Sequence, residues 1–317
     1  MQMQSTEQNI LDIKRLKAEK NAIILAHYYQ TGDIQDIADF VGDSLALSQK
    51  AAKNSADIII FAGVKFMAET AKILAPGKKV LLPDLNAGCS LANSCKAEDF
   101  ENFLNENSGR TVISYVNTTA EIKALSDIIC TSSNAVQIIE SLPVEEKIIF
   151  APDRNLGNYI HNKTGRDIVI WNGSCHVHEE FSLEAILRLK KENPDAKIIV
   201  HPECELPVRM VADFIGSTSS LLQFTKKDKG NCYIVATEVG IIHQMKKENP
   251  GKIYIPAPPK DSTCGCSECN FMKLITIEKI LNCLKNEEPE IIIDDKILIR
   301  AQKPIQRMMK ISEKLGL

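Results

Sequence analysis

The stretch NAIILAHYYQTGDIQDIADFVGDS, residues 21–44, decides the fold. It opens with an apolar run of strand character, continues through polar residues, and ends with a second short apolar run that leads into Asp43 and Ser44. The same pattern begins again at RTVISYVN, residues 110–117, and at AKIIVHPE, residues 196–203. The chain therefore carries one segment three times, and this internal repetition defines the architecture.

Each copy continues in the same way after its first apolar run. The second runs are ADFVGDS (38–44), SDIICTS (126–132) and ADFIGST (212–218). They align one aspartate per copy, namely Asp39, Asp127 and Asp213. A third apolar run follows in every copy, and a fourth leads to a cysteine. Each copy thus has four runs of strand character.

The runs are short and rich in β-branched residues, and segments of helical periodicity separate them. This alternation predicts βα units and parallel sheets that are buried on both faces. We expect an α/β fold of three related repeats, each with a four-stranded parallel sheet, around one shared site. The predicted segments are 1–109 with an amphipathic helix near 5–20, 110–195, and 196–317 with a helix near 295–315.

The composition is that of an ordinary globular chain, with 44% hydrophobic, 25% charged and 5% aromatic residues. A net charge of −3 gives no reason to expect nucleic acid or an anionic membrane as a partner. The chain has no apolar stretch near the roughly 20 residues that a membrane span needs, and its first residues lack the apolar region of a signal peptide. We therefore expect a cytoplasmic protein.

Polar residues follow the first strand of every copy, where parallel α/β sheets bind their ligands. They are His27, Tyr28 and Tyr29, then Tyr115 and Asn117, then His201 and Glu203. A hydroxyl residue stands 17 positions later in each copy, counting from His27 to Ser44, from Tyr115 to Ser132 and from His201 to Thr218. Such agreement predicts one site built from all three copies.

These strand-end residues suggest two kinds of chemistry. Each hydroxyl precedes a helical segment and is predicted to be its N-cap, so three helix N-termini would form an anion site for phosphate or carboxylates. The histidines, tyrosines and Glu203, together with His178, supply proton donors and acceptors for general acid/base work on a carbonyl or imine substrate.

Ten cysteines in a reducing compartment favour metal ligation or catalysis over a disulfide scaffold. Cys89 and Cys175 each follow the fourth run of a copy, and Cys264, Cys266 and Cys269 do so in the third. One thiolate per copy fits a [4Fe–4S] cluster with one iron left open as a Lewis acid. Three thiolates could also hold a zinc ion with an open position, although carboxylate-rich substrates and dehydration chemistry favour iron and sulfur.

The remaining cysteines have a simpler explanation. Cys130, Cys204, Cys232 and Cys283 lie in or beside strands and helices, where a buried thiol acts as a small apolar side chain. Cys95 fits either a buried or a functional position. Two other functions also fit the pattern: an anion-binding sensor of redox state or metal supply, and an aconitase-like hydro-lyase.

Motifs along nearly the whole chain carry a family resemblance. They are AHYYQTGDIQDIADFVGDSL (26–45), FMAETAKIL (66–74), PDLNAGCSLA (83–92), Tyr115 with Asn117, APDRNLG (151–157), WNGSCHVHE (171–179), HPEC (201–204) and CNFMKL (269–274). In these motifs the chain closely resembles the quinolinate synthase family, the A protein of de novo NAD biosynthesis.

The resemblance implies a pseudo-trimer of three-layer αβα units around a central active site. It also implies a [4Fe–4S] cluster and the condensation of iminoaspartate with dihydroxyacetone phosphate to quinolinate, phosphate and water. An oxidase or dehydrogenase would supply the iminoaspartate. The family ligands map to Cys89, Cys175 and Cys269, with Cys264 as the alternative because its distance from Thr218 is closer to the spacing in the other copies.

The resemblance also assigns roles to the strand-end residues. Proton transfer and substrate orientation fall to His27, Tyr29, His178, His201 and Glu203, with Tyr29 and Glu203 as the main acid/base candidates. Tyr115 and Asn117 would bind a substrate carboxylate. Phosphate, and later the product carboxylates, would be held by Ser44, Ser132, Ser217 and Thr218.

Overall fold

The computed structural model describes residues 2–260 and 267–317, and it contains three four-stranded sheets that are parallel throughout. All three sheets have the same strand order, in which the second strand is at one edge and the first, third and fourth follow. The first sheet comprises β2 (Phe40–Gly42), β1 (Ala22–His27), β3 (Ile58–Ala62) and β4 (Lys79–Leu81). The second comprises β6 (Ile128–Cys130), β5 (Thr111–Tyr115), β7 (Ile148–Ala151) and β8 (Ile168–Ile170). The third comprises β10 (Phe214–Ile215), β9 (Lys197–Val200), β11 (Cys232–Ala236) and β12 (Ile253–Pro256). The predicted threefold repeat is confirmed.

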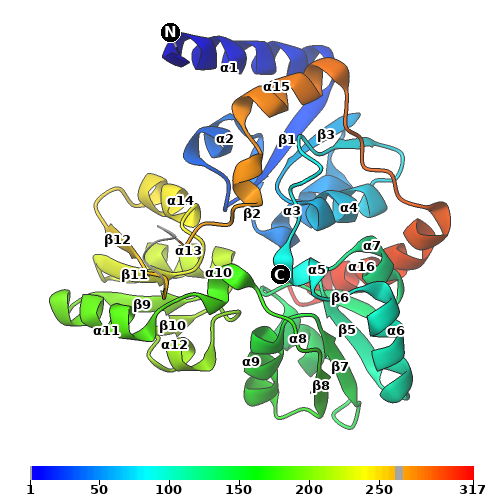
Figure 1. Cartoon of the computed structure of the whole chain (residues 1–317), viewed down its shortest axis with the longest axis vertical. Helices are drawn as coiled ribbons and strands as arrows, with labels where there is room; N and C mark the ends of the chain where they lie inside the picture. Colours follow the sequence, from blue (N-terminus) through cyan, green and yellow to red (C-terminus); the bar gives the residue numbers. More distant parts are fainter. Residues whose placement is uncertain (1, 261–266) are drawn as a thin grey trace.

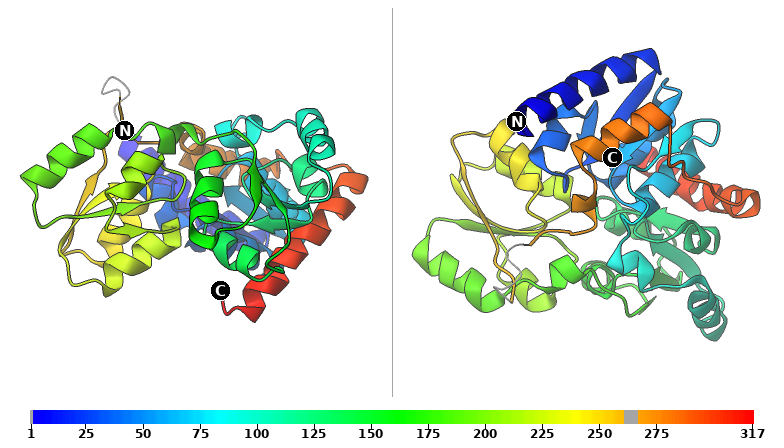
Figure 2. Two further views of the ribbon diagram at one scale, coloured as in Figure 1. Left: turned by 90° about the horizontal axis from the view of Figure 1, so that it is seen from below. Right: turned by 45° about the horizontal axis from the view of Figure 1, so that its top comes forward.

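Helices cover both faces of each sheet, so each repeat is a three-layer unit (Figure 1). The first unit contains α1 (Gln2–Glu19), α2 (Gly32–Ile37), α3 (Ser44–Lys53), α4 (Lys65–Leu74) and α5 (Ser90–Asn93). The second contains α6 (Ala97–Glu106), α7 (Ala120–Ala124), α8 (Ala135–Glu140), α9 (Arg154–Thr164) and α10 (His176–Glu179). The third contains α11 (Leu183–Glu192), α12 (Leu206–Met210), α13 (Thr218–Lys227) and α14 (Ile241–Glu248). The three units surround a common centre, as two further views confirm (Figure 2).

The repeat extends to single hydrogen bonds at the start of every second strand. The Asp39 carboxylate accepts the Ile24 N–H at 2.7 Å, and its own N–H donates to the Ile24 carbonyl. Asp127 makes the same pair of bonds with Val112, and Asp213 makes it with Ile198. In each copy the aspartate satisfies a strand N–H that would otherwise lack a partner at the sheet end. The alignment of the three aspartates is confirmed.

The predicted terminal helices are present, and the end of the chain returns to the first two units. A short 3₁₀ turn (η1, Met272–Leu274) leads to α15 (Ile277–Asn286), which packs on α1 and β3. The last helix, α16 (Asp295–Lys314), packs on α7 and β6 of the second unit and on α4 of the first. Figure 1 shows these orange and red helices beside the blue and teal units rather than beside the third.

The apolar core follows this arrangement. Buried residues of the first two units and of α15 and α16 form one continuous cluster, for example Ile60, Ile113 and Ile305. The third unit has two clusters of its own on the two faces of its sheet, around Ile234 and around Tyr233. The boundaries at residues 109 and 195 stay a prediction; α6 and α11 pack on the sheets that follow them.

Candidate functional site

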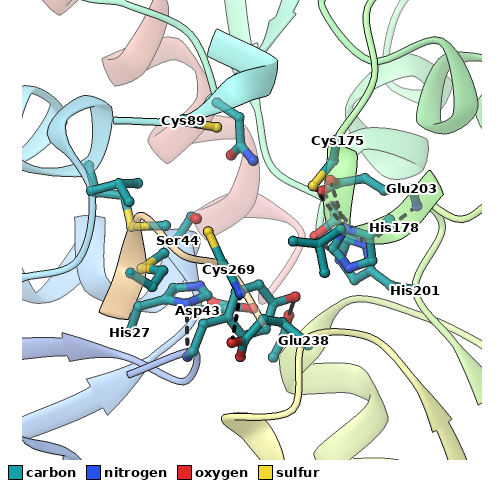
Figure 3. A pocket seen from close by; sticks show the side chains of 18 of the residues that line it. His27, Asp43, Ser44, Cys89, Cys175, His178, His201, Glu203, Glu238 and Cys269 are labelled. Carbon is teal, nitrogen blue, oxygen red and sulfur yellow. Dashed lines mark hydrogen bonds and ion pairs between the residues drawn. The ribbon is translucent and has the colours of Figure 1, made fainter. Parts of the chain in front are cut away.

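One cavity lies where the carboxyl ends of the strands of all three sheets meet (Figure 3). The predicted site residues that line it are His27, Tyr29, Ser44, Cys89, Tyr115, Asn117, Ser132, Cys175, His178, His201, Glu203, Thr218 and Cys269. Ser217 is not among the lining residues. Residues spread over most of the chain thus converge because each follows a strand at the same edge of its sheet.

The hydroxyl residues of the three copies are not the N-caps that the sequence predicts. Asp43 caps α3 by accepting the Ala46 N–H, and Ser217 caps α13 by accepting the Ser220 N–H. In α8 the N-cap position belongs to Asn134. A cap has extended backbone and stands before the helix, whereas Ser44 and Thr218 are already the first helical residues. Their hydroxyls are therefore free to face the cavity.

Glu203 is the centre of a buried polar cluster. The Tyr115 hydroxyl donates to its Oε1 at 2.5 Å, and His178 Nδ1 lies 3.2 Å from its Oε2. Burial acts to raise the pKa of Glu203, but His178, His201 and the Tyr115 hydroxyl outweigh it and hold the pKa below its usual range. Burial also raises the pKa of Tyr115 well above 10. The cluster therefore holds a carboxylate against a protonated phenol.

A chain of hydrogen bonds leads from Glu203 across the cavity wall to the first unit. His178 Nε2 lies 3.0 Å from the Thr237 hydroxyl, which lies 2.8 Å from the Tyr29 hydroxyl. The Tyr29 hydroxyl in turn is 3.0 Å from the Thr218 hydroxyl. Burial raises the pKa of Tyr29 well above 10, so its phenol keeps its proton. The chain connects a carboxylate to a phenol through groups that can both donate and accept protons.

His27 and His201 occupy equivalent places and share one hydrogen-bond pattern. Each accepts, at Nδ1, the N–H of the residue two positions later, at 3.2 Å from Tyr29 and 3.4 Å from Glu203. Burial lowers the pKa of His27 to about 4 and that of His201 to about 3. Both rings are therefore neutral near pH 7, with Nε2 as the donor. His201 Nε2 donates to the Ser132 hydroxyl at 3.3 Å.

Three cysteines, one from each unit, border the same cavity (Figure 3). Cys89 and Cys175 immediately precede the short helices α5 and α10, and Cys269 precedes η1. Burial raises the pKa of Cys89 to about 12 and raises the pKa of Cys175 and Cys269 as well. Thiolates of half-buried cysteines with raised pKa values need a cation beside them, so the donor set fits a bound metal.

A second metal-ligating arrangement overlaps the first. Ligand atoms of Cys175, His178 and Glu203 all lie within 4.8 Å of one another. The Cys175 thiol is 3.3 Å from His178 Nδ1. The alternative ligands Cys264 and Cys266 lie outside the described residues. The geometry therefore supports a metal site that includes Cys175.

The comparisons with known proteins agree with this site. A family model described as "Quinolinate synthetase A protein" matches residues 11–310. The chain belongs to this family. Relatives named quinolinate synthase include one from Microcystis aeruginosa, 59% identical over 300 residues that cover 95% of this chain and 94% of the relative. Another, from Synechococcus, is 58% identical over the same shares of the two chains. The chain thus has quinolinate synthase function in NAD biosynthesis.

The other described cysteines of this quinolinate synthase family member play no visible part in the site. Cys130, Cys204 and Cys283 are buried, as predicted. Cys232 is half-buried at the first position of β11, so the prediction of burial is wrong for it. Cys95 is buried in an apolar cluster with Phe100. Within the described residues, no helix is long and apolar enough to cross a bilayer.

Sequence reasoning missed several polar residues of the quinolinate synthase site, among them Asp43, Thr237 and Glu238. Asp43 and Glu238 line the cavity, and Thr237 joins Tyr29 to His178. Thr237 and Glu238 directly follow β11, the third strand of the third unit. A signal was present, because comparing the ends of the third strands would have pointed to both residues.

We expect the stability of the protein to fall as the pH drops from 6.5 towards 4. Over this range an unfolded His27 takes up a proton that the buried ring excludes, since its folded pKa is about 4 rather than 6.5. Proton uptake by one such unfolded histidine lowers the unfolding free energy by up to about 1.4 kcal/mol for each pH unit below 6.5. It has little effect at higher pH. Denaturant unfolding across this range should show a smaller slope in His27→Gln. The exposed control His161→Gln should keep the wild-type slope, and equal slopes in all three would contradict the prediction.

Proposed function

We propose that this chain condenses iminoaspartate with dihydroxyacetone phosphate to give quinolinate, phosphate and water, using a [4Fe–4S] cluster held by Cys89, Cys175 and Cys269. The observation that carries the proposal is the convergence of one half-buried thiol per unit on a cavity that also contains a connected acid/base network. With three protein ligands, the cluster would supply one open iron as a Lewis acid for a substrate hydroxyl or carboxylate.

Proton transfer is assigned to the hydrogen-bonded chain. Tyr29 carries a phenolic proton and can donate it, because its pKa is raised by burial. Glu203 is a carboxylate and can accept a proton, with His178 beside it to share the charge. Thr237 lies between the Tyr29 and His178 groups and relays protons between them. The steps that need both an acid and a base therefore find both in one cavity.

Substrate binding is assigned to the neutral donors around the cavity. Tyr115 and Asn117 are assigned to a substrate carboxylate, towards which the Asn117 amide Nδ2 is the donor. Asn117 Oδ1 is a buried oxygen that has no hydrogen-bond partner within the described residues. Ser44, Ser132 and Thr218 hold the phosphate and later the product carboxylates, while the neutral His27 and His201 donate from Nε2. An unpaired buried acceptor is costly, which supports a ligand with a hydrogen-bond donor at this place.

We also propose a cytoplasmic location with small-molecule substrates and neither nucleic acid nor a membrane as a partner. The proposed iminoaspartate source is an oxidase or a dehydrogenase, because oxidation of an amine gives an imine. The three segments 1–109, 110–195 and 196–317 are proposed as the repeats that share the site.

A second candidate is a hydro-lyase that uses a metal ion at Cys175, His178 and Glu203, since these three residues could hold an ion without Cys89 or Cys269. Two measurements on anaerobically purified protein separate the candidates. Iron and sulfide analysis with a visible spectrum distinguishes an iron–sulfur cluster from zinc. Chromatography then detects quinolinate formed from dihydroxyacetone phosphate and iminoaspartate; its absence in iron-loaded protein would overturn the synthase proposal.

A further inference from the structure

Glu238 is a carboxylate without solvent exposure at the back of the cavity, and donors surround it. Its Oε2 accepts the Gly240 N–H at 2.7 Å, and its Oε1 accepts the Cys269 N–H at 3.2 Å. Lys273 Nζ lies 2.8 Å from the same Oε1. A buried carboxylate is stable only with such partners, so Glu238 requires the Cys269 loop to stay in place.

Lys273 extends this contact to the first unit. Its Nζ also donates to the Tyr29 carbonyl at 2.6 Å, and its N–H donates to the Cys269 carbonyl at 3.2 Å. One ion pair thus contacts the end of β11, the Cys269 loop and the turn that carries Tyr29. These three segments are far apart in the sequence.

The backbone around the pair is closely packed. A Cβ added to Gly240 would lie 2.7 Å from the Tyr28 carbonyl oxygen and 2.8 Å from the Tyr29 carbonyl carbon. The buried Gln35 amide donates to the carbonyls of Tyr28, Gln30 and Gly240 at 2.8 to 2.9 Å. The turns of the first and third units are therefore in close contact at the Glu238 and Lys273 pair.

We propose that Glu238 and Lys273 are positioning residues that fix the Cys269 thiol and the Tyr29 phenol relative to each other. The proposal rests on the proposed function in one respect, the assignment of Cys269 as the third thiolate. The same ion pair would then position both the metal ligand Cys269 and the proton donor Tyr29. Residues that hydrogen-bond to a metal ligand commonly orient it in this way.

The test compares metal release from matched variants of the loaded protein. Glu238→Gln and Lys273→Met are expected to lose metal to a chelator about 10- to 100-fold faster than wild type. Lys247→Met is the control, because Lys247 makes an exposed ion pair of 2.8 Å with Asp36 that joins the same two units. The double variant Glu238→Gln/Lys273→Met should be no worse than the worse single variant, since neither charge is left unpaired.

Two local readouts distinguish positioning from a general loss of stability. Alkylation during metal release, read by peptide mass spectrometry, should modify Cys269 before Cys89 and Cys175 in Glu238→Gln, with no such order in wild type. Turnover should fall in kcat with KM little changed, because Tyr29 is displaced and the substrate donors are not. Release rates equal to those of Lys247→Met, or one alkylation order in all variants, would overturn the proposal.

Failure of the proposed function gives a different pattern. Zinc in place of iron and sulfide, or no quinolinate, would refute that function while metal release and alkylation still report on the support of Cys269. If Cys269 of wild type is alkylated equally fast with and without metal, it is not a ligand, and the positioning proposal fails with that assignment.

Discussion

The Cys175→Ser protein is expected to lose its metal cluster and its quinolinate formation together. Serine oxygen is a poor substitute for a thiolate, and Cys175 is one of only three proposed protein ligands. Loss of about 4 kcal/mol of metal-assisted stabilisation corresponds to a decrease in turnover of about a thousandfold. Iron and sulfide content, the visible spectrum and the quinolinate assay measure the effect.

Two companion variants make this result specific. Cys232→Ser is the matched control, because Cys232 is a half-buried cysteine away from the cavity and should leave iron content and turnover unchanged. Cys89→Ser separates the two metal sites. It should remove the cluster as completely as Cys175→Ser does, whereas an ion held by Cys175, His178 and Glu203 would survive it. Full turnover in an iron-free Cys175→Ser protein would contradict the cluster proposal.

The Glu203→Gln protein should retain its cluster while its turnover falls about 10²- to 10⁴-fold, the usual worth of a general acid/base group. The amide oxygen can still accept the Tyr115 hydroxyl proton, so the cavity keeps its shape. The amide cannot accept a proton at neutral pH, and it removes the charge beside His178. Iron content and steady-state quinolinate formation are measured on the same preparation.

The control for this variant is Glu205→Gln. Glu205 is two residues away and pairs with Lys260 at 2.8 Å on a partly exposed face. It does not line the cavity, so turnover should stay at the wild-type value. Normal turnover in Glu203→Gln would remove this carboxylate from the mechanism, and loss of iron there would point to a role in holding metal instead.

The architecture could be predicted because each repeat is recognisable from short stretches of sequence. The apolar runs and the residues that follow them, such as His27 and His201, depend on strand ends that sequence marks clearly. In the first and third copies the cap was predicted one residue late, for example at Ser44 instead of Asp43, because both residues can cap and only backbone conformation decides between them. In the second copy it was predicted two residues early, at Ser132 instead of Asn134.

The packing of the last two helices was beyond the sequence signals. The amphipathic pattern of α16 predicts an apolar face but not the unit that covers it, because any of the three repeats presents helices of similar character. Glu238 was missed for a different reason, since its burial depends on Lys273 and on a loop from far along the chain.

Because the apolar core is divided unevenly, the three units do not depend on one another equally for their stability. The first two units share one cluster, which α16 extends, so neither can unfold without exposing apolar surface of the other. The third unit buries its own clusters and contacts the first through polar groups such as the Gln35 amide, which donates to the Gly240 carbonyl. Unfolding is therefore cooperative between the first and second units but not between these two and the third. We therefore expect the first two units to unfold together and the third to unfold separately, although the strand order repeats three times.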